Sequence, residues 1–147
     1  MMKNRPLIIF LGGFLFFCLD QIIKQLSLRV FTHKHLLFKI FGWNPFLNHG
    51  IAFGLPFPNI LTIIFTIIIL CILVFVLVKH TEIKNGNQIF IGLTLIFWGA
   101  SSNLLDRLIY KNTIDYILIG TGIINLADII ITLGFIVYLL PHKFFKT

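Results

Sequence analysis

The chain has 147 residues, of which 58% are hydrophobic and only 12% are charged, and its mean hydropathy is +0.98. Soluble domains carry roughly twice that share of charged residues, so the composition excludes a soluble enzyme, a disordered protein and a secreted disulfide scaffold. The formal net charge is +7, and the basic residues lie in short clusters between apolar runs. Cations in such places bind lipid headgroups, which argues against nucleic-acid binding. The composition therefore predicts a single integral membrane domain, residues 1–147.

Four segments are long and apolar enough to cross a bilayer core, which requires about 20 apolar residues in a helix. We expect them at about residues 7–26, 60–78, 89–105 and 123–140. Pro58 and Pro141 are suitable helix boundaries, and the Asn-Gly-Asn sequence at 85–87 predicts a turn between the second and third segments. The predicted fold class is an all-α membrane protein with four transmembrane helices.

The four spans leave two loops on the side opposite the termini, at about residues 28–59 and 107–122. The first loop mixes apolar and basic residues between Leu36 and Trp43, which is typical of a segment lying at the membrane interface. We expect this small segment to be partly β. Lys and Arg number six on the side of the termini and five on the other, which favours cytoplasmic termini by a narrow margin.

Three of the spans carry polar residues at one expected depth. At 1.5 Å per residue, Asp20, Asn103 and Asp128 each lie about 20 Å from the membrane surface nearest the termini. Each has polar neighbours at helical spacing on its own face: Lys24, Asp106, Arg107 and Asn125. Ionisable residues inside a membrane are costly and usually functional, although polar contacts that hold helices together are the alternative.

Two carboxylates, Asp115 and Asp128, are expected to approach each other at the external end of the bundle. A close carboxylate pair shares one proton, so one member can activate water while the other donates to a substrate carbonyl. This is the arrangement of aspartic proteases. A His-x-His sequence, His33 and His35, lacks a third ligand and is a weak metal signal, so we expect neither a metal nor another cofactor.

A small transporter or channel subunit is the alternative from another functional class, because intramembrane Asp and Asn residues also line ion paths. An ion path needs polar groups through the full thickness of the membrane. The segment 60–78 offers only Thr62 and Thr66, and the acids gather at one end. The peptidase interpretation is therefore favoured.

Five short blocks, in chain order, resemble one known family. They are Asp20-Gln21-Ile22-Ile23-Lys24, Asn48-His49-Gly50-Ile51-Ala52-Phe53-Gly54, Asn103-Leu104-Leu105-Asp106-Arg107, Ile114-Asp115-Tyr116 and Asn125-Leu126-Ala127-Asp128. They are similar to the D-Q-x-x-K, N-x-G-x-A-F, G-N-x-x-D-R, D-F and F-N-x-A-D blocks of bacterial lipoprotein signal peptidase, also called signal peptidase II. Each block alone is weak, but together they cover nearly the whole chain and are specific.

The resemblance implies a four-helix aspartic peptidase of the bacterial cytoplasmic membrane, with its active site toward the outer face. Such enzymes cut a diacylglyceryl-modified prolipoprotein before its lipidated cysteine, and globomycin-type peptides inhibit them. By position, Asp115 and Asp128 match the catalytic pair. The residues matching substrate-binding positions are Asn48, Asn103, Arg107 and Asn125. The residues matching supporting positions are Asp20, Lys24, Gly50, Asp106 and Ala127, and the small Ala127 is expected to leave room for a peptide beside Asp128.

The chain departs from the family pattern at a few positions. The third-span block, G-G-A-x-G-N in the family, has Trp98 and Ser102 in place of two glycines that would allow close helix approach. Tyr116 and Ile124 replace phenylalanines. The 13 residues from Asp115 to Asp128 are several fewer than usual. No acid is lost, so we expect an active but divergent member, with an inactive paralogue as the alternative.

Overall fold

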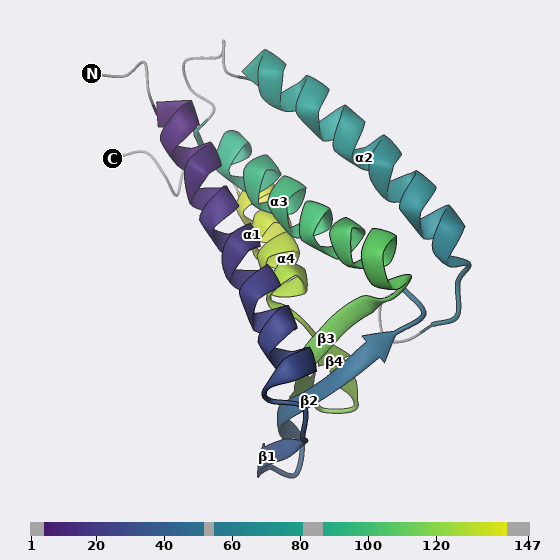
Figure 1. Cartoon of the computed structure of the whole chain (residues 1–147). Coiled ribbons are helices and arrows are strands. Elements are labelled where there is room, and N and C mark those ends of the chain that lie inside the picture. The colour runs from purple at the N-terminus through teal and green to yellow at the C-terminus, as the bar shows by residue number, and fades with distance from the viewer. Residues whose placement is uncertain (1–4, 52–54, 81–86, 141–147) are drawn as a thin grey trace.

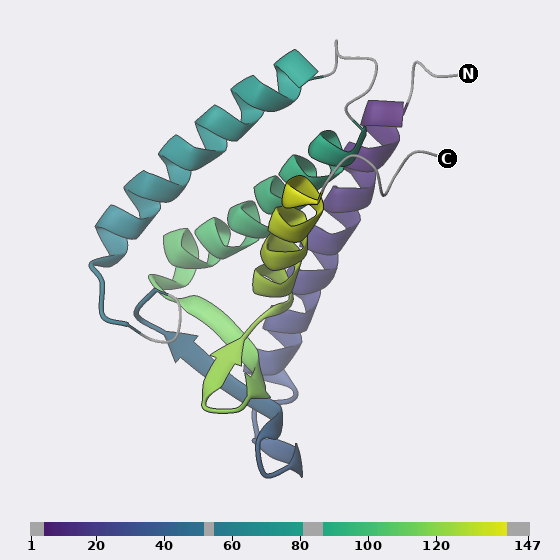
Figure 2. The same ribbon diagram turned by 180° about the vertical axis from the view of Figure 1, so that it is seen from behind.

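The computed structural model describes residues 5–51, 55–80 and 87–140, which form four helices and a four-stranded antiparallel sheet (Figure 1). The helices are α1 (Arg5–Arg29), α2 (Asn59–His80), α3 (Asn87–Tyr110) and α4 (Leu126–Leu139). The strands are β1 (His35–Phe38), β2 (Phe41–Asn48), β3 (Thr113–Ile119) and β4 (Gly122–Ile124). The sheet lies at one end of the helices, opposite the first turn of α1 and the last turn of α4 (Figure 2).

Among the described residues, three helices are long and apolar enough to cross a membrane: Arg5–Arg29, Asn59–Lys79 and Gln88–Tyr110. Large apolar side chains are exposed along much of α1 and α2, as a lipid environment requires. Helix α4 is shorter, with 14 residues that rise about 21 Å. It begins at Leu126 rather than at residue 123, because Gly122–Ile124 pairs with β3 as a strand.

The sheet is larger than the sequence predicts, and the all-α fold class is wrong in this respect. The first loop supplies β1 and β2, as expected, but the second loop supplies β3 and β4. β-branched and aromatic residues dominate the segment Thr113–Ile119, which favours a strand. It pairs with β2 from Phe41↔Ile119 to Asn48↔Thr113. Helix α3 also continues to Tyr110, so Arg107 is helical and not part of a loop.

Glycines bring α3 and α4 into close contact at the centre of the bundle. A Cβ atom added to Gly92 would lie 2.8 Å from the carbonyl oxygen of Gly134, and one added to Gly99 would lie 2.8 Å from that of Ala127. Small residues at these positions let the two backbones approach, as is common between membrane helices. This contact fixes the position of α4, which carries one of the two predicted catalytic acids.

Trp98, which replaces a family glycine, faces α1 instead. Its indole Nε1 donates a hydrogen bond of 3.0 Å to the carbonyl oxygen of Phe10, and its ring packs against Phe14 and Phe17. Gly13 leaves room for it, because a Cβ atom there would lie 2.5 Å from the indole. The substitution therefore changes the α1–α3 contact and leaves the close α3–α4 contact intact.

Candidate active site

A cavity of about 710 Å³ lies between the sheet and helices α2, α3 and α4. Asp115 and Asp128 both line it. Three of the predicted substrate-binding residues line it as well: Asn48, Asn103 and Arg107. Isoleucines and threonines form most of the remaining wall, so polar groups gather at one place in an otherwise largely apolar cavity. This combination is typical of a site that holds an extended, partly apolar ligand.

Asp128 is positioned by the start of α4. Asn125 is the N-cap residue, and its side-chain oxygen accepts a hydrogen bond of 2.9 Å from the amide of Asp128. In return, Asp128 Oδ2 accepts one of 3.2 Å from the amide of Asn125, which completes a capping box. Asp128 Oδ1 accepts a third, of 2.8 Å, from Asn103 Nδ2. In the first turn of a helix, the aligned peptide dipoles favour a negatively charged carboxylate.

Asp115 lies on β3 and is 1% exposed. Its Oδ2 accepts a hydrogen bond of 2.9 Å from Asn48 Nδ2, and its Oδ1 accepts one of 2.7 Å from Asn125 Nδ2. The pairing of β2 with β3 places Asn48 beside it. Burial, together with the negative charge of Asp128, raises the pKa of Asp115 to about 6, although the two hydrogen bonds act in the opposite direction.

Two asparagines connect the acids. Asn125 donates to Asp115 through its amide nitrogen and caps the Asp128 amide through its oxygen. Asn103 donates to Asp128 and accepts a hydrogen bond of 3.1 Å from Asn125. Both acids line one cavity, and these asparagines link them in a shared polar network.

A buried ion network lies behind these asparagines. Lys24 Nζ is 2.7 Å from both Asp20 Oδ2 and Asp106 Oδ2, and all three side chains are fully buried. The predicted Asp20–Lys24 pair is confirmed, and it is shared with α3 through Asp106. Lys24 also donates a hydrogen bond of 2.9 Å to Asn103 Oδ1. Because this bond engages the amide oxygen, the NH₂ group of Asn103 is directed at Asp128.

Two hydroxyls that depart from the family pattern extend this network, and sequence reasoning missed their roles. Ser102 Oγ donates a hydrogen bond of 2.6 Å to Asp20 Oδ2, and Tyr116 Oη donates one of 3.1 Å to Asp20 Oδ1. Tyr116 Oη also accepts a hydrogen bond of 3.0 Å from the amide of Leu126, in the first turn of α4. Burial and the negative charge of Asp20 raise the pKa of Tyr116 above its ordinary value, so its hydroxyl stays protonated. Hydroxyls at unexpected positions inside two motif blocks were the available signal.

The remaining predicted residues hold the surroundings of the cavity. Arg107 donates a hydrogen bond of 2.5 Å to the carbonyl oxygen of Gly50 and one of 3.2 Å to Asn59 Oδ1. These bonds connect α3 to the segment that follows β2 and to the first residue of α2. The backbone amide of Gly50 donates a hydrogen bond of 2.9 Å to Asn48 Oδ1. Ala127 is fully buried and does not line the cavity. Its backbone amide donates a hydrogen bond of 3.2 Å to Asp20 Oδ1. Its small side chain therefore serves packing and does not make room for a peptide.

The end of one motif block, at residues 52–54, lies outside the described residues. Within the described ranges, no group of three His, Cys, Asp or Glu side chains is placed to hold a metal ion.

The model of the family described as signal peptidase (SPase) II matches residues 13–144. The chain belongs to this family. Lipoprotein signal peptidase of Helicobacter pylori strain HPAG1 is 33% identical over 97% of the chain and 92% of its own length. Lipoprotein signal peptidase of Bartonella quintana is 39% identical over 86% of the chain and 80% of its own length. The chain is accordingly a peptidase, and family membership agrees with the resemblance given by the five motif blocks.

Solved structures agree with the fold. A bacterial membrane enzyme solved by the in meso method at 2.3 Å resolution superposes with a TM-score of 0.75 and 25% identity, over 93% of this chain and 86% of that one. A second, solved at 1.9 Å resolution, gives a TM-score of 0.72 at 24% identity, over 93% and 91% of the two chains. Together with the apolar helices, this similarity identifies an integral membrane protein.

Proposed function

We propose that the chain is a membrane aspartic endopeptidase that removes the signal peptide from diacylglyceryl-modified prolipoproteins, with Asp115 and Asp128 as its catalytic pair. The observation that carries this assignment is the meeting of both carboxylates in one cavity, linked through Asn125. Membership of the signal peptidase II family supports the reaction and the substrate class. The transporter alternative has no comparable support.

In this mechanism the two acids differ because their surroundings differ. Asp128, at the N-terminal turn of α4, carries the negative charge and accepts a proton from the attacking water. Asp115, whose pKa is raised to about 6, holds the shared proton and donates it to the scissile carbonyl oxygen. A peptide that displaces water from the cavity raises this pKa further, because burial disfavours the charged form.

The same pair completes the reaction. When the tetrahedral intermediate collapses, Asp128 returns its proton to the leaving amine, and a hydroxyl of the intermediate returns one to Asp115. The leaving amine is that of the lipidated cysteine. Asn48, Asn103, Arg107 and Asn125 bind the peptide backbone or hold the acids that act on it, and the ion network of Asp20, Lys24 and Asp106 supports them. No metal takes part in these steps.

Substrate reaches the cavity from within the bilayer. The cavity includes Thr62 and Thr66 at the start of α2 and an apolar face of α4, so acyl chains can stay in lipid while the peptide contacts the acids. We further propose one membrane domain of residues 1–147 with four spans, counting α4 as the fourth. It lies in the bacterial cytoplasmic membrane with both termini in the cytoplasm and the cavity toward the outer face. Globomycin-type peptides would occupy this cavity.

The test is a cleavage assay with purified enzyme and a prolipoprotein prepared with and without its diacylglyceryl group, each incubated with and without a chelator. We expect the lipidated precursor to be cut and the unlipidated one to be cut poorly, with no effect of the chelator. Equal cutting of both precursors contradicts lateral entry, and inhibition by the chelator contradicts the two-aspartate mechanism. An enzyme that is folded but cuts neither precursor supports the inactive paralogue.

A further inference from the structure

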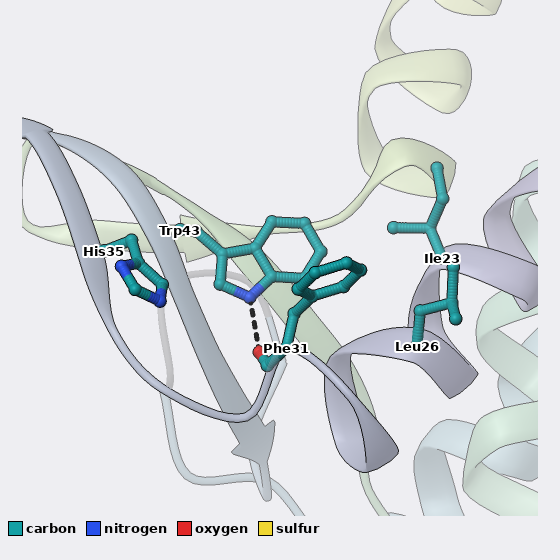
Figure 3. Close-up of a pocket in the computed structure, with 5 residues that line it drawn as sticks. All are labelled: Ile23, Leu26, Phe31, His35 and Trp43. Atoms are coloured by element: carbon teal, nitrogen blue, oxygen red, sulfur yellow. Dashed lines mark hydrogen bonds between the residues drawn. The ribbon is translucent and has the colours of Figure 1, made fainter.

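A second pocket, of about 400 Å³, lies between the last turns of α1 and the β1–β2 hairpin. Five residues line it: Ile23, Leu26, Phe31, His35 and Trp43 (Figure 3). None of them lines the cavity that holds Asp115 and Asp128. The exposed surface of the pocket is apolar, so water inside it finds few hydrogen-bond partners. We therefore expect an apolar group to occupy the pocket.

Trp43 gives this pocket a fixed shape. Its indole Nε1 donates a hydrogen bond of 2.7 Å to the carbonyl oxygen of Phe31, and the rings of Phe31 and Trp43 meet edge to face at 6.2 Å. Figure 3 shows the indole between His35 and Phe31, with Ile23 and Leu26 approaching from α1. The polar atom of Trp43 is thus satisfied by the chain itself. Its ring also packs against Tyr116, with centroids 5.0 Å apart, and only the part that lines the pocket is left for an apolar ligand.

The pocket continues the lipid-facing surface of α1. Four exposed residues lie along one face of this helix at spacings of four, three and four, and the last of them lines the pocket: Leu15, Leu19, Ile22 and Leu26. An acyl chain lying along this face would run directly into the pocket. The hairpin beside it is also apolar, since Leu37 and Phe38 are both more than 70% exposed.

Exposed basic residues adjoin the lining residues of the pocket along the chain. Arg29 ends α1 one turn after Leu26, Lys34 directly precedes the lining residue His35, and Lys39 lies at the turn of the hairpin. All three are exposed. The sequence has no Asp or Glu between Asp20 and Glu82, and Asp20 is fully buried against Lys24. The segments that line the pocket therefore carry exposed cations and no exposed acid beside an apolar wall.

We propose that this pocket binds an anionic glycerophospholipid of the surrounding membrane, with an acyl chain against Trp43 and the phosphate held by Arg29 and Lys34. The diacylglyceryl group of a substrate carries no phosphate and gains nothing from these cations, and its cysteine must reach the other cavity. A zwitterionic lipid also gains less, because its ammonium group opposes the cations. Each basic residue near an anionic surface strengthens lipid binding by about fivefold.

Trp43 provides a direct probe, because the chain has only two tryptophans. The Trp98→Phe variant, reconstituted into vesicles, leaves Trp43 as the sole indole. Phospholipids brominated on their acyl chains quench tryptophan on contact, so quenching by brominated phosphatidylglycerol and by brominated phosphatidylcholine gives the relative affinity of the two lipids at Trp43. If Trp98→Phe does not fold, the difference in quenching between the unmodified protein and Trp43→Phe gives the same quantity.

We expect phosphatidylglycerol to be favoured at Trp43 by at least fivefold over its share of the bilayer. Arg29→Gln and Lys34→Gln should each reduce this preference about threefold to fivefold. The control, Lys111→Gln, removes an exposed cation beside the start of β3, away from the pocket, and should leave the preference unchanged. If the two brominated lipids quench Trp43 only in proportion to their shares of the bilayer, the proposal that the pocket prefers an anionic headgroup is overturned. Absence of quenching by either lipid overturns the lipid site altogether.

Discussion

Replacing Asp115 with Asn should make the protein more stable at pH 8, while abolishing its activity. The ordinary pKa of an aspartate is 3.8, and burial raises that of Asp115 to about 6. Between these values the folded state binds more protons than the unfolded state, so the free energy of unfolding falls as pH rises. The stability that the protonated form provides is complete below pH 4 and is lost above about pH 6.

The size of this effect follows from the interval between the two pKa values. It corresponds to about 3 kcal/mol of stability lost by the unmodified protein between pH 4 and pH 8. Asn carries no charge and resembles protonated Asp115, so it avoids the loss. It offers only one acceptor oxygen to Asn48 and Asn125, and the missing hydrogen bond removes about 1 kcal/mol. The expected net gain at pH 8 is therefore about 2 kcal/mol.

The assay is thermal unfolding of both proteins in the same detergent at several values between pH 4 and pH 8. At pH 8 we expect Tm to rise by about 4–8 °C for Asp115→Asn, and at pH 4 we expect no gain. The control is Asp106→Asn, which breaks the buried ion pair with Lys24 and should lower Tm at pH 8. An Asp115→Asn protein that is no more stable than the unmodified one at pH 8 refutes the argument that burial of this charge opposes folding.

Three further predictions concern the surrounding network and the substrate. Tyr116→Phe leaves the amide of Leu126 without its acceptor, so the free energy of unfolding should fall by about 1–2 kcal/mol. We also expect kcat to fall several-fold with little change in KM. An unchanged kcat contradicts a positioning role. Lys24→Met leaves Asp20 and Asp106 as uncompensated buried acids and should destabilise the protein by about 3–5 kcal/mol. Folded yield and Tm measure this loss. A normal yield and Tm would show that the two ion pairs of Lys24 contribute little to stability. Removal of the diacylglyceryl group from the precursor should lower kcat/KM in the cleavage assay, whereas a chelator should leave kcat/KM unchanged.

The helices and the acids were predictable because they depend on local pattern. Continuous apolar runs identify α1, α2 and α3, and the i,i+3 spacing of Asn125 and Asp128 predicts one polar face. The capping box itself was not predicted, because the helix was expected to begin at about residue 123. The i,i+4 spacing of Asp20 and Lys24 likewise gave the buried pair. In each case the deciding interaction lies within one helix.

The features that sequence reasoning missed depend on contacts between distant segments. Residues 113–119 become a strand by pairing with β2, about 70 residues earlier in the chain, and no local signal specifies that partner. The contact of Trp98 with Gly13 crosses from α3 to α1, and the Tyr116 hydroxyl joins β3 to α1 and α4. Ala127 was misinterpreted for the same reason, since its burial against α3 is a tertiary feature.

The most direct test of the two-aspartate mechanism is the single-turnover rate of Asp128→Asn on a lipidated prolipoprotein, measured on protein whose Tm and gel-filtration profile match those of the unmodified enzyme. The matched control is Asn112→Ala, which changes a polar residue beside β3 that does not line the cavity. The account predicts a loss of at least about 100-fold for Asp128→Asn, the usual contribution of a general base, and an unchanged rate for the control. A folded Asp128→Asn enzyme that cuts the precursor at near the original rate would contradict the assignment of the catalytic pair.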